Sequence, residues 1–243
     1  MLLKYKADRD KYTVAEREVS CRASWHLRGI DVNEAGQVHA YICDLRDLPY
    51  SEQLHWKSFN EKPKASISER AVTNDFKGEF TSFSSPLCEV LRIVRRWHEA
   101  NATWWTLRDE KLLERVNIPV TSSRDEWAEA FMDLAKLVNE GFEVKNLRER
   151  LRVATVDFDS KEGSIVLLER LLNQGHESDQ QEQLHGLRTA QKIRSVVKGH
   201  AGSSEANQLT NDALSRHETF ANHFKFVSDQ IASELSTLEA MLM

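Results

Sequence analysis

Alternation of apolar and polar residues is the first clear signal along the chain. From Val19 to Leu27 every second residue is apolar, which is typical of a strand with one buried face. Residues 33–36 (Asn-Glu-Ala-Gly) supply turn chemistry, and apolar residues alternate again from Val38 to Ile42. The two runs predict a β-hairpin, and no third convincing strand follows. Because an isolated hairpin is marginal in water, helices, a partner chain or preceding sequence must cover its apolar face.

Further along the chain, the spacing of apolar residues changes to a helical period. Residues 48–61 predict a short helix, and residues 62–85 look irregular. Ser85 and Pro86 fit the N-cap and first position of a helix that reaches about Ala100. Further helices are expected at residues 108–116, 123–140, 143–153, 162–173, 180–198 and 206–241. The expected fold is mainly α, a helical bundle with a small N-terminal β-hairpin region (α+β).

Size and charge limit the classes of protein that fit. With 243 residues, 40% of them hydrophobic and 29% charged, the chain can form one large or two small domains. The irregular stretch suggests a boundary, which gives an N-terminal region at residues 1–83 and a helical domain at residues 84–243. A formal net charge of -5 argues against wholesale coating of nucleic acid, so any RNA contact must be local.

The sequence lacks the signals of several common classes of protein. The first ten residues lack the apolar core of a secretory signal, and no window is apolar enough for a membrane span, so a cytoplasmic protein without membrane insertion is expected. Cys21, Cys43 and Cys88 show no paired spacing, so they should stay reduced and hold no structural metal. There is no glycine-rich phosphate loop, nucleophile elbow or zinc-protease helix, and no cofactor is expected.

The candidate chemistry lies at Arg194 and His200, because an Arg and a His at this spacing can bind and cleave a phosphodiester. Spacing alone does not select them, since an Arg is followed by a His at similar spacing at Arg92/His98, Arg170/His176 and Arg216/His223. Projection onto a helix separates the pairs. Arg194 falls within an apolar arc, whereas Arg92 and Arg170 fall on polar faces. Arg216 is ambiguous by the same test. The arc consists of Leu184, Leu187, Ala190, Ile193 and Val197.

Two neighbouring features favour the same pair. Lys198-Gly199 is typical of a helix end, which would let His200 turn toward Arg194. The sequence between Glu182 and Glu205 contains no acidic residue. Its basic residues are Arg188, Lys192, Arg194 and Lys198. We therefore expect a local patch that an RNA backbone can use, with Arg188, Lys192 and Lys198 as binding residues.

The segment from Arg194 to His200, on a late helix followed by another long helix, resembles the Arg-x(4-6)-His signature of HEPN domains. The resemblance covers roughly residues 123–243. It implies a metal-independent endoribonuclease of the kind found in toxin and phage-defence systems, acting as a homodimer. Many active members carry Asn, Asp or His directly after the Arg, where this chain has Ser195. Other members are helical binding modules without catalysis.

The resemblance also implies a separate catalytic role for each of the two residues. His200 would act as general base for the RNA 2′-hydroxyl or as acid for the leaving 5′-oxygen, because a histidine titrates near neutral pH. Arg194 would bind the scissile phosphate and stabilise its transition state. The expected product is a 2′,3′-cyclic phosphate, without a metal.

Alternatives remain open at this point. One alternative is a non-catalytic interaction module whose N-terminal hairpin docks a partner protein. In that case Arg194 serves only as a structural partner of a core carboxylate, and His200 caps the helix. Another alternative is that the basic strip binds RNA or nucleotides without cleavage. Four tryptophans suggest a base-stacking platform, but helical spacing favours the core. They are Trp97, Trp104, Trp105 and Trp127.

Overall fold

A computed structural model gives the structure of the chain. It describes residues 1–8, 11–15, 17–21, 24–33, 35–79, 85–119, 121–174, 183–198 and 203–243. The contacts divide the chain into two compact units, Met1–Phe83 with Val120–Ser122, and Ser84–Pro119 with Ser123–Met243. The expected fold class is confirmed, since the structure is mainly helical with a small antiparallel β region near the N-terminus.

The first unit holds all the described strands and several short helices. Its elements are α1 (Leu3–Ala7), β1 (Tyr12–Ala15), β2 (Glu18–Cys21), β3 (Trp25–Arg28), β4 (Asp31–Val32), β5 (Val38–His39), α2 (Ile42–Arg46), α3 (Tyr50–Ser58) and the π-helix η1 (Ala71–Phe76). β1, β2 and β3 form one antiparallel sheet in that order, and β4 pairs with β5. The apolar core of the unit gathers on this sheet and on α1 and α3.

The prediction of a single strand from Val19 to Leu27 is wrong, because the chain folds back within it. β2 and β3 pair antiparallel, with Val19 opposite Leu27 and Cys21 opposite Trp25. Paired residues are an even number of positions apart, so the odd positions of both strands share one face. The alternation of apolar residues therefore continues unbroken through the turn, and the sequence pattern does not reveal it.

The second alternating run also pairs differently from the expectation. Val38 lies opposite Val32, so β5 pairs with β4, and Ile42 begins α2 instead of continuing a strand. The turn at residues 33–36 is confirmed, since the Asn33 side chain accepts a hydrogen bond from the Gln37 backbone at 2.9 Å and Gly36 has φ of 72°. The stretch expected to be irregular contains η1, whose end is fixed by charged contacts.

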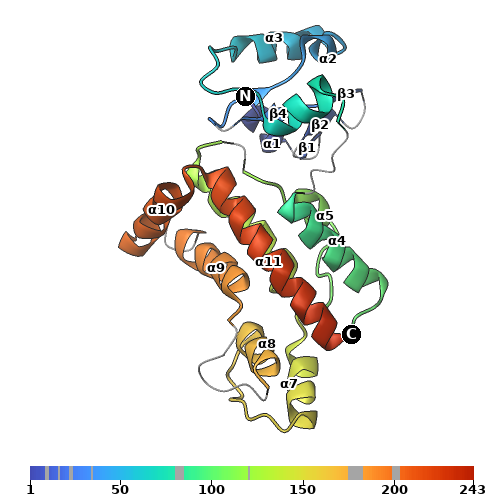
Figure 1. Cartoon of the computed structure of the whole chain (residues 1–243), viewed down its shortest axis with the longest axis vertical. Helices are drawn as coiled ribbons and strands as arrows, with labels where there is room; N and C mark the ends of the chain where they lie inside the picture. The colour runs from blue at the N-terminus through green and yellow to red at the C-terminus, as the bar shows by residue number, and fades with distance from the viewer. Residues whose placement is uncertain are drawn as a thin grey trace. The chain divides into compact units, whose positions relative to one another are not determined.

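The second unit is a helical bundle around a long C-terminal helix. Its elements are α4 (Pro86–Glu99), α5 (Leu112–Arg115), α6 (Arg124–Val138), α7 (Val144–Val153), α8 (Ser164–Leu172), α9 (His185–Ile193), η3 (Arg194–Lys198), α10 (Ser204–His217) and α11 (Phe220–Leu242). Figure 1 shows α11 running between α4 and α9, and both helices pack on it. The four tryptophans of this unit are buried in its core, which confirms the structural reading of those residues.

Capping side chains mark the starts of α4, α6, α10 and α11. Ser85, Ser123 and Ser203 each accept a hydrogen bond from the backbone three residues later. The expected single helix over residues 206–241 is wrong, since α10 ends at His217 and α11 begins at Phe220. Thr219 caps α11 by accepting from the Asn222 backbone at 3.1 Å. Among the helices that the structure describes, none is long and apolar enough to cross a membrane.

Candidate functional site

The helix that carries Arg194 changes its winding at that residue. α9 ends at Ile193, and the π-helix η3 continues from Arg194 to Lys198. The five residues of the predicted apolar arc are all buried. Short π-helical turns are rare in proteins. Where they do occur within a helix, they are frequently found at functional sites. The change of winding thus falls on the Arg that sequence reasoning selected.

Arg194 is partly exposed, unlike the five buried residues of the arc, and forms an ion pair. Its Nη2 contacts Oε1 of Glu140, and the Arg194 and Glu140 side chains are 32% and 39% exposed. The pair is therefore open to solvent on part of its surface. A guanidinium has five N–H donors, so one contact with a carboxylate leaves donors for a second anion.

The backbone around Glu140 is held by two other segments of the second unit, α9 and residues 105–108. Asn139 donates from Nδ2 to the Leu187 carbonyl at 3.1 Å, which ties the end of α6 to α9. Arg108 donates from Nε to the Glu140 carbonyl at 3.0 Å. Phe142 forms an isolated antiparallel bridge with Trp105. These contacts therefore hold the backbone of Glu140 in place.

Gly141 allows this close approach. A Cβ atom at Gly141 would lie 2.2 Å from Nε1 of Trp105. The Trp105 ring is buried, and its Nε1 donates to the Val138 carbonyl at 3.3 Å, so it cannot move aside cheaply. Only glycine fits next to Glu140 without displacing the tryptophan.

The predicted RNA-binding residues meet carboxylates from other elements. Arg188 donates from Nε to Oε1 of Glu169 at 2.6 Å, and a second contact joins its Nη2 to Oε2. This hydrogen bonding raises the pKa of Arg188 above its usual value. Nζ of Lys192 lies 3.4 Å from Oε1 of Glu205. No acidic residue lies near these basic residues in the sequence. In the folded chain, however, carboxylates from other elements largely neutralise their charge.

His200 and Lys198 are the remaining predicted site residues. His200 lies outside the described residues, and so does the side chain of Lys198. The approach of His200 to Arg194 therefore stays a prediction. Sequence reasoning missed Glu140 and Glu169. A signal existed for Glu169, which follows the buried Ile165 by one helical turn and so falls on the apolar face of α8.

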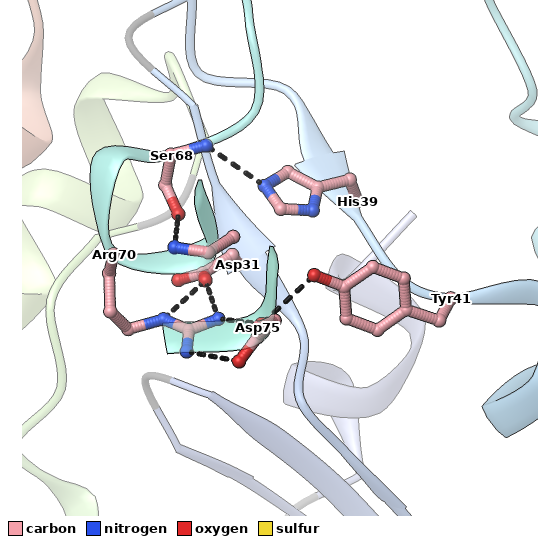
Figure 2. Close-up of polar contacts among 7 residues, drawn as sticks. Asp31, His39, Tyr41, Ser68, Arg70 and Asp75 are labelled. Atoms are coloured by element: carbon pink, nitrogen blue, oxygen red, sulfur yellow. Dashed lines mark hydrogen bonds and ion pairs between the residues drawn. The ribbon is translucent and has the colours of Figure 1, made fainter. Parts of the chain in front are cut away.

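A second polar cluster lies in the first unit (Figure 2). Arg70 donates from Nε to Oδ2 of Asp31 at 2.6 Å, and from Nη1 and Nη2 to the two oxygens of Asp75 at 3.2 and 2.9 Å. The Tyr41 hydroxyl donates to Oδ2 of Asp75 at 2.9 Å. These contacts join η1 to the β4–β5 hairpin and to the start of α2.

Titration in this cluster follows from burial and pairing. Hydrogen bonds from Arg70 lower the pKa of Asp75. Burial, followed by the hydrogen bond to Asp75, raises the pKa of Tyr41 to about 12. Burial lowers the pKa of His39, whose Nε2 accepts from the Ser68 backbone at 3.5 Å. Because the charged groups satisfy one another, we interpret the cluster as a structural clamp on η1.

The described residues contain no group of three or more His, Cys, Asp or Glu side chains arranged to hold a metal ion. Comparison of the chain with protein-family models, curated proteins and solved structures finds no match in any of the three. Arg194 and its surroundings are therefore the candidate functional site.

Proposed function

We propose that the helical unit is a metal-independent, HEPN-like endoribonuclease whose site is built on Arg194 and His200, as in the toxin and phage-defence proteins that the motif resembles. The observation that carries the proposal is the π-helical turn η3, which begins at Arg194 and ends one residue before the Gly199-His200 step. The partly exposed side chain of Arg194 supports it further, because a phosphate must reach the guanidinium from solvent.

The chemistry needs only these two side chains and the RNA. His200 accepts the proton of the ribose 2′-hydroxyl, and the 2′-oxygen attacks the adjacent phosphorus while the bond to the 5′-oxygen breaks. The leaving 5′-oxygen takes a proton from water, the protonated His200 returns its proton to solvent, and the products are a 2′,3′-cyclic phosphate and a 5′-hydroxyl end. Arg194 stabilises the negative charge that builds on the phosphate oxygens. Such an enzyme would act on cytoplasmic RNA, as a homodimer in the HEPN manner.

RNA cleavage by the purified chain in the presence of EDTA tests the proposal. We expect His200→Ala and Arg194→Ala each to lower the rate by about 100-fold or more. Arg170→Ala and His176→Ala are matched controls, because they remove a pair of the same spacing. Arg170 is likewise partly exposed and bound to a carboxylate, Glu162. Undiminished cleavage by His200→Ala, or no cleavage by the wild-type chain on any single-stranded RNA, contradicts the proposal.

A non-catalytic interaction module is the second candidate, favoured by exposed apolar side chains in the first unit. They lie between residues 42 and 76 and include Ile42, Tyr50, Leu54, Phe59, Ile67 and Phe76. Tyr50 and Leu54 stand one turn apart on α3 and so present one apolar stripe. If self-association uses this stripe, Tyr50→Ser with Leu54→Ser weakens it in sedimentation equilibrium. An unchanged mass distribution contradicts self-association through α3.

A further inference from the structure

The contact between Glu140 and Arg194 brings together two elements that are distant in the sequence, the end of α6 and the start of η3. We propose that Glu140 is a positioning residue, which holds the guanidinium of Arg194 in the orientation that receives the scissile phosphate. This inference rests on the proposed ribonuclease function and adds a third residue to the site.

The geometry of the contact suits positioning. The closest atoms of the pair are Nη2 of Arg194 and Oε1 of Glu140, and both side chains are exposed by about a third. An ion pair limits rotation of the long Arg194 side chain. A guanidinium has five N–H donors, so pairing with one carboxylate leaves donors for a phosphate.

The support behind Glu140 separates this pair from an ordinary surface ion pair. In Arg92–Glu89 and Arg152–Glu149 both partners lie on one helix, three residues apart. Glu140 instead follows Asn139, which is tied to α9, and precedes Gly141, whose place against Trp105 admits no side chain. A residue that orients another group is effective only when its own backbone is fixed.

Kinetics of RNA cleavage by Glu140 variants test the inference. We expect Glu140→Ala to lower kcat by about 10- to 100-fold, since a misplaced binding group is costly in the transition state, while KM changes less than about 3-fold. Glu140→Gln keeps an acceptor oxygen and should retain more activity than Glu140→Ala. Glu162→Ala is the matched control, because it removes the carboxylate partner of Arg170 and should leave kcat unchanged.

Two kinetic results overturn the inference. One is a wild-type kcat in Glu140→Ala, which leaves the proposed function standing and removes only the role of Glu140. The other is an equal loss of kcat and thermal stability in Glu140→Ala and Glu162→Ala, which assigns both carboxylates to folding alone. If the wild-type chain cleaves no RNA, the proposed function itself fails, and the role of Glu140 fails with it.

A readout that does not depend on activity completes the test. The side-chain Nε–Hε signal of Arg194, assigned by its absence in Arg194→Lys, should be sharp and slow to exchange in the wild type. In Glu140→Ala the signal should broaden and exchange faster, because the guanidinium rotates freely. Identical signals in both proteins overturn the inference, since Glu140 then does not hold Arg194.

Discussion

Nε1 of Trp127 donates a hydrogen bond to Nδ1 of His223 at 3.2 Å, inside the core of the helical unit. Burial, and then the nearby His217, lowers the pKa of His223 to about 4. A histidine in the unfolded chain titrates near pH 6.5. Between pH 6.5 and about 4 the unfolded state therefore binds more protons than the folded state, and folding stability falls as the pH drops through this window.

We predict that the titration of His223 alone lowers the free energy of unfolding by an amount on the order of 2–3 kcal/mol across that window. Urea unfolding from pH 7 to pH 4 measures it. His223→Gln cannot gain a charge and should show a flatter profile, although it starts from a lower stability at pH 7. His98→Gln, on the exposed face of α4, is the control. Parallel profiles for wild type and His223→Gln would rule out this titration as the source.

Arg188 is predicted to contribute to folding more than to RNA binding. Its partner Glu169 is only 8% exposed and also accepts a hydrogen bond from the Leu184 backbone at 3.0 Å. Arg188→Ala leaves that carboxylate without its charged partner, so we expect a loss of about 1–2 kcal/mol in unfolding free energy. Lys192→Ala, at a solvent-exposed pair, should cost less than about 0.5 kcal/mol. Weaker RNA binding by Arg188→Ala at unchanged stability contradicts this assignment.

Thr155 occupies an unfavourable backbone position after α7. Its φ is 55°, and the backbone N–H groups of Thr155 and Val156 close the helix end on the carbonyls of Arg152 and Leu151, at 3.1 and 3.0 Å. A β-branched residue is strained at positive φ, so Thr155→Gly should raise the unfolding free energy by about 1 kcal/mol.

Asn101 provides the comparison for Thr155. It follows α4 in the same type of helix end, with φ of 52°. Asparagine tolerates this conformation better than threonine, so Asn101→Gly should change stability by less than about 0.5 kcal/mol. Chemical denaturation of both variants measures the difference, and an equal response at the two sites contradicts the argument from β-branching.

Gly186 sets how closely α9 approaches α11. A Cβ atom at this position would lie 2.8 Å from the backbone nitrogen of Ile231. Gly186→Ala must push the two helices apart, and we expect a loss of about 1–3 kcal/mol. Gly163→Ala is the control, since nothing lies within 4 Å of its added Cβ. A melting temperature for Gly186→Ala that equals that of Gly163→Ala would mean that the helices separate without cost.

Helix positions were largely determined by the sequence itself, because the signals that start and bury a helix lie within a few residues of one another. Ser85 and Pro86 marked the start of α4, and the arc around Ile193 marked the buried face of α9. The break between α10 and α11 was also visible in principle, since Thr219 is a good capping residue. The periodic apolar pattern on both sides of it concealed the break.

Only the tertiary structure decided which charges meet. The sequence around Arg194 contains no acidic residue, yet Glu140, Glu169 and Glu205 come from three other segments to pair with its basic side chains. The tertiary structure also decided that the chain turns back between β2 and β3. The sequence pattern does not show this turn, because paired residues are an even number of positions apart and the apolar alternation continues through it. Local sequence patterns determine local structure. Which residues distant in the chain come into contact depends on how the elements pack, and the periodicity of apolar residues contains no information about that.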